Sequence, residues 1–265
     1  MDSIPMIRLF GKCSFEHGGA AIEDLKCARS RELLGYLACN RNRDLPREVV
    51  VETLWGDMQE EQGKRALRQT LWQLQSALGP FHITARRPLI EADGEWLRLN
   101  SNSGIWIDVE KFEGVEKLTR LKKGEPVPAD HQGNLREGVT LYSGQLLEGC
   151  FSDWCVNQRN ILQQKYMKML SRLMFQQRRS NDIEGAMATA LLLLEEEPAS
   201  EQAHGMIMVL HYRDGDRTSA LRQFQRYKQI MRDEFNVRKP SVIRRAFGKY
   251  ARIALRVFTI LRELW

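Results

Sequence analysis

Apolar residues in the first part of the chain follow the two-residue period of strands and then the longer period of helices. Ile7-Arg-Leu-Phe-Gly11 alternates and ends at a glycine, as a short strand does. Lys26–Cys39 then predicts a helix with one apolar side, formed by Leu33, Leu34, Leu37 and Ala38. A second helix is expected from Asp44-Leu-Pro-Arg47, with Pro46 at its first position, and it ends near Trp55-Gly56.

A third helix is predicted over Gln62–Leu78, where Gly79-Pro80 ends it. Its leucines recur in steps of four, three and four residues and form one narrow stripe, Leu67, Leu71, Leu74 and Leu78. The extended segments 82–85 and 89–91 follow, and the turn at Asp93-Gly94 leads into Trp96-Leu-Arg-Leu as a hairpin. Strands, three helices and a terminal hairpin in this order predict a winged helix of the OmpR type.

From Ile107 onward the spacing predicts an almost entirely helical chain. The expected helices are Asp108–Leu121, His131–Tyr142, Ser152–Arg179, Ile183–Glu196, Ser200–Tyr212, Arg217–Phe235 and Ser241–Leu264. Asn181-Asp-Ile-Glu-Gly-Ala186 and Gly215-Asp-Arg-Thr-Ser-Ala220 lie 34 residues apart, which is the tetratricopeptide period. With a linker at Asn100–Gly104, we predict a mainly α protein with a small β component, made of a winged-helix domain (1–104) and a tetratricopeptide-like domain (105–265).

Charge and composition narrow the class of protein without identifying the binding surface. The net charge is +6, yet residues 1–106 hold 14 Lys/Arg and 14 Asp/Glu, so the positive excess lies in the helical half. No apolar run reaches the length of about 20 residues that spans a membrane, and the first residues do not resemble a secretory signal. Five cysteines without a CxxC pair predict reduced thiols in a cytoplasmic protein.

The third helix carries the strongest candidate for DNA binding. Lys64, Arg65 and Arg68 lie in its first two turns, and no acidic residue occurs between Gln62 and Leu78. A helix in the major groove presents its N-terminal turns to base edges, where arginine pairs with guanine and glutamine with adenine. Arg65, Arg68 and Gln69 therefore suit base readout, and Lys64 suits a phosphate contact. A solvated face of an ordinary amphipathic helix is the alternative; the position between two helices and a hairpin favours DNA.

Other basic residues are weaker candidates. Arg86 and Arg87 lie between the extended segments, where they suit the minor groove or phosphates, and a solvated loop is the alternative. Arg41 and Arg43 follow the first helix and suit backbone phosphate. Two acid-free basic stretches, within 154–181 and 236–261, suit flanking phosphate, an acidic partner or plain solvation.

Catalytic, cofactor and metal sites are not expected. The sequence contains no P-loop, GxGxxG, GxSxG or HExxH motif, and its five histidines are dispersed. The acidic run Glu195–Glu197 precedes Pro198 and suits a solvated helix end better than a metal site. We therefore do not expect an enzyme.

The ordered set of motifs resembles the SARP-type activators, the antibiotic regulatory protein family. The motifs are Ile7-Arg-Leu-Phe-Gly, Ala28-Arg-Ser-Arg-Glu-Leu-Leu, Leu54-Trp, Ala66-Leu-Arg-Gln-Thr-Leu, Trp96-Leu-Arg-Leu, Ile107-Asp-Val, Phe112, Leu141-Tyr-Ser-Gly-Gln-Leu-Leu, Arg213-Asp-Gly-Asp-Arg, Ala220-Leu, and Asp233-Glu-Phe-Asn-Val with Pro240. Together they span nearly the whole chain. The family joins an OmpR-like winged helix to a bacterial transcriptional activator domain of tetratricopeptide-like helices.

The resemblance implies an activator that binds direct repeats in double-stranded DNA near promoters and recruits RNA polymerase, including its sigma factor. It also allows a dimer or side-by-side protomers on the DNA, and it implies no membrane partner. Gln73 is a further candidate DNA contact by its place in the third helix. Gln73, Gln75 and Ser76 stand where many members carry basic residues, so phosphate contact there is expected to be weaker.

Two other functions compete with this one. In the first, the chain is a helical-repeat adaptor whose winged helix contacts protein rather than DNA, and the neutral charge of residues 1–106 supports it. In the second, a pocket among the repeat helices senses a small ligand, for which the sequence has no signature.

Overall fold

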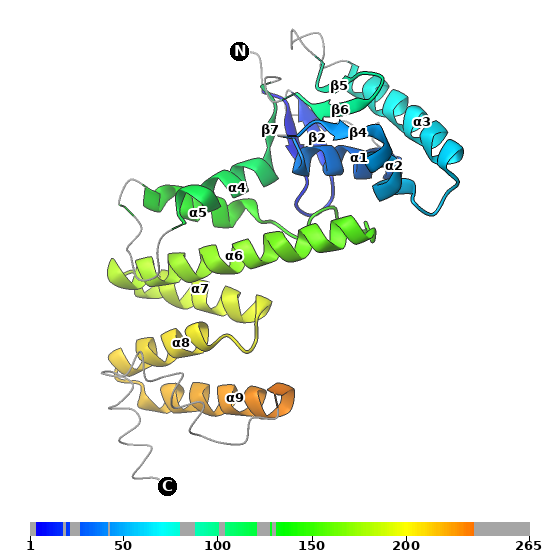
Figure 1. Ribbon diagram of the computed structural model, residues 1–265. Coiled ribbons are helices and arrows are strands. Elements are labelled where there is room, and N and C mark those ends of the chain that lie inside the picture. The colour runs from blue at the N-terminus through cyan, green and yellow to red at the C-terminus, as the bar shows by residue number, and fades with distance from the viewer. Residues whose placement is uncertain are drawn as a thin grey trace. The chain divides into compact units, whose positions relative to one another are not determined.

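The computed structural model describes residues 4–17, 20–21, 27–41, 43–79, 88–100, 104–120, 128 and 131–235 (Figure 1). The chain forms two compact units: residues 1–120 with 137–165, and residues 121–136 with 166–265. The first unit thus includes both the N-terminal strands and helical residues beyond 104. The predicted boundary between the winged-helix domain (1–104) and the tetratricopeptide-like domain (105–265) stays a prediction.

A four-stranded sheet lies at the N-terminal end of the first unit, in the order β3-β2-β1-β7. Its strands are β1 (Met6–Arg8), β2 (Ser14–His17), β3 (Ala20–Ala21) and β7 (Trp106–Ile107). β1 pairs antiparallel with β2, whereas it runs parallel to β7, with Met6 opposite Trp106. The sheet therefore joins the first strand to the start of the segment expected to be helical.

Three helices and a hairpin follow in the predicted order, which confirms the winged helix. The helices are α1 (Ala28–Cys39), α2 (Arg47–Trp55) and α3 (Glu60–Leu78); the strands are β4 (Leu45–Pro46), β5 (Ile90–Ala92) and β6 (Trp96–Leu99). β6 lies between β4 and β5, and both pairings are antiparallel. Pro46 precedes α2 rather than opening it, because it pairs with Trp96 in the small sheet. The extended segment expected at 82–85 lies outside the described residues.

The first unit continues into α4 (Asp108–Leu118), part of α5 (Gln132–Leu141) and the start of α6 (Asp153–Arg179). The carboxylate of Asp108 accepts hydrogen bonds from the backbone N–H groups of Leu9 (2.8 Å) and Phe10 (2.9 Å). Burial raises the pKa of this carboxyl group, although these hydrogen bonds act in the opposite direction. The side chain of Arg159 on α6 donates to the carbonyl oxygen of Leu146 (2.6 Å) and fixes the loop before α6.

The second unit contains α7 (Ile183–Glu196), α8 (Glu201–Arg213) and α9 (Arg217–Phe235), with α7 packed on α8 and α8 on α9. The two six-residue motifs that lie 34 residues apart adopt the same local structure. Asn181 and Gly215 both have positive φ, and Asp182 and Asp216 then cap α7 and α9 by accepting from the N–H groups of Gly185 (3.0 Å) and Ser219 (2.9 Å). Ala186 and Ala220 are fully buried, as close packing of repeat helices requires. The helix expected at 241–264 lies outside the described residues.

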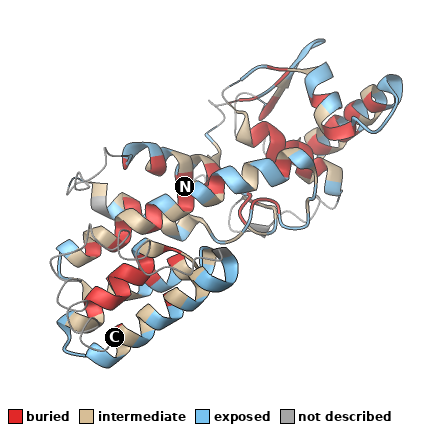
Figure 2. Ribbon diagram, turned by 60° about the horizontal axis from the view of Figure 1, so that its bottom comes forward, coloured by how far each residue is buried: buried red, intermediate tan, exposed pale blue. Residues whose placement is uncertain are grey.

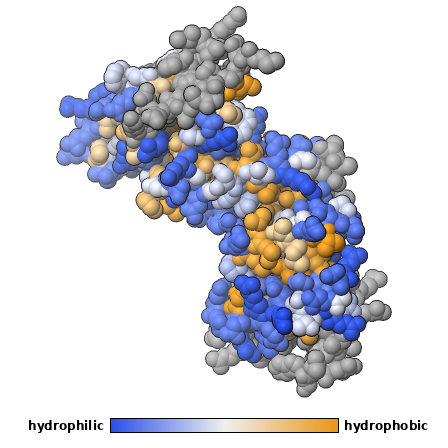
Figure 3. Space-filling model, turned by 180° about the vertical axis from the view of Figure 1, so that it is seen from behind, coloured by the Kyte–Doolittle hydropathy of each residue, from blue (hydrophilic) through white to orange (hydrophobic). Residues whose placement is uncertain are grey.

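Buried residues gather on the inner sides of the helices in each unit, and exposed residues lie along their outer sides (Figure 2). Polar residues cover much of the face in Figure 3, where apolar residues also gather in places. Leu191 and Leu192 on α7 are among the exposed large apolar side chains, at 48% and 40% exposure. The helix-rich architecture with a small β component is the fold class that the sequence predicted.

Candidate nucleic-acid interface

The helix α3 is held by one apolar face. The predicted stripe of Leu67, Leu71, Leu74 and Leu78 is buried throughout. A Cβ atom on Gly63 would lie 2.7 Å from Cγ1 of Val51, so the glycine allows α3 to approach α2 closely. The other side of α3 is thereby left to solvent, as a helix that reads DNA requires.

The outward face of α3 carries the predicted readout residues. Arg65, Arg68 and Gln69 are exposed, and Gln73 is half-buried. Neither arginine forms an ion pair with any residue that the structure describes. Their spacing of three and four residues places Arg65, Arg68 and Gln69 on one side of the helix. The structure thus brings together two free guanidinium groups and an amide.

Trp72 extends the same face by one turn. Its side chain is 69% exposed. An indole ring of this exposure offers apolar contact area beside the arginines.

Lys64 differs from the two arginines because α3 begins two residues earlier than predicted. Glu60 and Glu61 enter the first turn, and the ammonium group of Lys64 lies 2.5 Å from the Glu60 carboxylate and 3.9 Å from that of Glu61. The hydrogen bond raises the pKa of Lys64 and lowers the pKa of Glu60. The charge predicted to contact phosphate is therefore already partly neutralised within the helix.

Hydrogen bonds stabilise the turn of the hairpin β5–β6, and ion pairs stabilise its strands. The Asp93 carboxylate accepts from the backbone N–H groups of Glu95 (2.9 Å) and Trp96 (2.6 Å), which lowers the pKa of Asp93. Arg98 pairs with Glu91 and Asp44, so its charge is used inside the fold. The candidates Arg86 and Arg87 lie outside the described residues.

Arg41 and Arg43 have different surroundings. The side chain of Arg41 is only 13% exposed and forms an ion pair with Glu110 on α4, and burial lowers the pKa of Arg41. Arg43 is exposed in the turn after α1. The structure thus gives Arg41 a partner inside the first unit and leaves Arg43 accessible.

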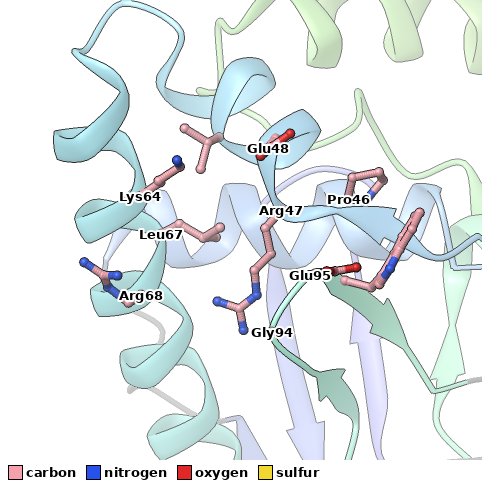
Figure 4. A pocket seen from close by; sticks show the side chains of 10 residues that line it. Pro46, Arg47, Glu48, Lys64, Leu67, Arg68, Gly94 and Glu95 are labelled. Carbon is pink, nitrogen blue, oxygen red and sulfur yellow. The ribbon is translucent and has the colours of Figure 1, made fainter.

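A hollow of about 570 Å³ lies between the start of α2, the first turns of α3 and the hairpin turn (Figure 4). It is lined by Pro46, Arg47, Glu48, Val51, Lys64, Leu67, Arg68, Gly94, Glu95 and Trp96. The side chain of Arg47 extends into it toward α3 and Gly94 (Figure 4). The sequence analysis did not identify Arg47, because no motif or spacing around the start of α2 singles it out.

The helix α1 supports this surface from behind and is tied to the segment that leads into α6. The buried Glu32 carboxylate accepts from the Arg29 guanidinium (2.9 Å), the Trp154 indole N–H (3.2 Å) and the Ser152 hydroxyl. The rings of Tyr36 and Trp154 meet edge to face at 5.1 Å. The winged helix therefore packs directly against residues 146–159.

Two further searches concern the described residues alone. No helix among them is long and apolar enough to cross a bilayer. Within the same residues, no group of three or more His, Cys, Asp or Glu side chains is arranged to hold a metal ion.

This geometry is that of a winged helix joined to repeat helices, an architecture typical of transcriptional regulators. The family model of the bacterial transcriptional activator domain matches residues 107–249, more than half of the chain. The chain belongs to this family and is a SARP-type transcriptional regulator rather than an enzyme, as the motif resemblance predicted.

Comparisons with individual proteins add to the fold. A search among curated proteins finds no match. Among solved structures, Mycobacterium tuberculosis EmbR in complex with a low-affinity phosphopeptide is similar, with a TM-score of 0.70 at 15% identity. The match covers 89% of this chain and 62% of that one, so this chain spans less than two thirds of that protein. A likeness at this identity concerns the fold alone.

Proposed function

We propose that the chain is a sequence-specific DNA-binding activator that binds direct repeats at promoters through α3. The observation that carries this proposal is the exposed face of Arg65, Arg68 and Gln69, which has no ion pair within the described part of the chain, on a helix buried along its opposite side. Such a helix enters the major groove with its N-terminal turns toward the base edges. Arg43, Arg86 and Arg87 are proposed as phosphate contacts, and Gln73 as a contact one turn further along α3.

The experiment is a selection of preferred duplexes from genomic fragments by the full chain, followed by affinity measurement. The double variant Arg65→Ala, Arg68→Ala is expected to lose the preference for the selected sequence. Lys111→Ala, Lys117→Ala is the matched control, because it removes two exposed charges from α4 in the same unit. If the wild type selects no fragment at low salt, the function fails, and the adaptor that contacts only protein takes its place. Unchanged binding by the α3 variant would show that another surface reads DNA.

We further propose that the helical segment contacts RNA polymerase. The support is the activator family together with the exposed Leu191 and Leu192 on α7, next to acidic residues at its end. Leu191→Ser, Leu192→Ser is expected to keep DNA affinity and to lose activation in a purified transcription assay. Leu118→Ser on α4 removes an equally exposed leucine and is the control. Full activation by the α7 variant would contradict this contact.

Direct repeats imply side-by-side protomers when their spacing is about one helical turn. Footprints and the mass of the protein–DNA complex test this arrangement. A regulator of promoters acts in the cytoplasm, where bacterial DNA lies.

A further inference from the structure

Arg47 has a donor without a partner. Its Nε atom is shielded from solvent and makes no hydrogen bond with any residue that the structure describes. A buried donor that loses water without gaining a partner is costly, and most buried polar groups in proteins have a partner. The backbone of Arg47 is well held, since its N–H donates to the carbonyl oxygen of Glu95 (2.8 Å). The atom without a partner is therefore the side-chain Nε, and the backbone of the residue is held in place.

Arg47 forms no ion pair with any residue that the structure describes, although its charge helps to lower the pKa of the Asp93 carboxyl group in the hairpin turn. Its guanidinium group extends into the hollow on the side of Arg68 and Gly94, and the carboxyl groups of Glu48 and Glu95 lie apart from it (Figure 4). Arg68 on the facing helix adds a positive charge that is exposed and has no ion pair among the residues that the structure describes. Lys64 adds little, because Glu60 and Glu61 hold it.

The geometry points to Arg47 as the site of one DNA backbone phosphate, held in the hollow between α3 and the hairpin turn. This inference rests on the proposed function. A helix in the major groove lies between two sugar–phosphate backbones, and phosphate contacts fix its register on the duplex. A guanidinium group presents donors in a planar fork that matches the oxygens of a phosphate. Arg47 thus sets how α3 sits in the groove and does not read sequence itself.

The test uses the full chain and a short duplex of arbitrary sequence, because a phosphate contact is independent of sequence. Arg47→Met keeps most of the apolar stem and removes the charge. We expect its affinity to fall about tenfold. The slope of log K against log salt should become shallower by about 0.9, the contribution of one phosphate contact. Arg47→Lys restores the charge without the fork. Its affinity should therefore lie between the affinities of Arg47→Met and the wild type.

Controls separate this contact from lost charge and from lost folding. Lys111→Ala removes one exposed charge on α4 and should leave the slope unchanged. Circular dichroism shows whether Arg47→Met is folded; if it is not, Arg47→Gln, which also removes the charge, replaces it in the slope and affinity measurements. On the selected sequence, Arg47→Met should weaken binding to matched and mismatched duplexes equally, whereas Arg68→Ala should weaken the matched duplex more.

Three results would overturn the inference. If Arg47→Met, or Arg47→Gln when the former is unfolded, has the wild-type slope and affinity, Arg47 does not contact phosphate although the chain binds DNA. If inorganic phosphate binds the wild type and not Arg47→Met, while DNA affinity is equal for both, the hollow holds a small anion instead. If the wild type binds no duplex, the proposed function fails together with the inference.

Discussion

The helices α1 and α3 lie in the same unit and pack against each other, yet they expose very different amounts of surface. Nearly every residue of α1 from Ser30 to Ala38 is buried, including the carboxylate of Glu32. In α3 the buried residues form one face, and the charged residues of the other face lie in solvent. The difference separates two tasks: α1 holds the unit together, and α3 presents side chains to a partner. Substitutions in the two helices should therefore change different quantities.

The largest effect on stability is expected from Leu34→Ala in α1. Leu34 is fully buried, and its loss leaves a cavity in the centre of the first unit. The free energy of unfolding should fall by about 3 kcal/mol. Urea denaturation followed by circular dichroism measures it, and a loss below about 1 kcal/mol would show that α1 is less central than its burial indicates.

The next effect is expected from Glu32→Ala. The Ser152 hydroxyl and the Trp154 indole N–H, which are partly buried, then lose the acceptor that the buried Glu32 provides. The free energy of unfolding should fall by about 2 kcal/mol, since unsatisfied buried donors carry the cost. Glu32→Gln keeps one oxygen acceptor and should recover part of this loss. Equal stability of Glu32→Ala and the wild type would argue that the contact to α6 does not stabilise the winged helix.

Arg68→Ala should change DNA affinity and leave stability almost unchanged, in contrast to the two substitutions in α1. Its side chain is exposed, so the free energy of unfolding should stay within about 0.5 kcal/mol of the wild type. Affinity for the selected duplex should fall by about 1–3 kcal/mol, the cost of one lost base contact. Fluorescence anisotropy with labelled DNA measures the second quantity. A destabilised variant with normal affinity would reverse the roles assigned to the two helices.

The smallest effect is expected from Lys64→Ala, which should lower DNA affinity clearly less than Arg68→Ala. Glu60 and Glu61 already pair with Lys64, so little positive charge is lost at the surface. Glu60→Gln, Glu61→Gln should instead raise the affinity, because it frees the lysine for phosphate. The comparison of both variants at low salt checks this. A loss from Lys64→Ala equal to that from Arg68→Ala would contradict the neutralising role of the two glutamates.

The sequence predicted the elements whose signals are local. The leucine stripe placed α3 and its outward face, and the 34-residue period aligned Asp182 with Asp216. That both residues cap the following helix is seen only in the structure. The start of α3 was placed two residues late, because Glu60 and Glu61 carry no apolar periodicity.

Contacts between residues far apart in the chain could not be predicted. The pairing of Arg41 with Glu110 joins residues that have no common pattern. The same holds for Glu32 with Ser152 and Trp154, and for the parallel pairing of β1 with β7. The position of Arg47 in a hollow depends on three elements at once, so no single stretch of sequence indicated it.

Photo-crosslinking from single positions of the full chain tests most directly which helix faces DNA. A photoreactive side chain replaces Gln69 on α3 in one variant and Ala28 on α1 in the other, both of which are exposed. The account predicts crosslinks to bases of the bound duplex from position 69 and none from position 28. Crosslinks from position 28, or a bound complex without crosslinks from position 69, would contradict it.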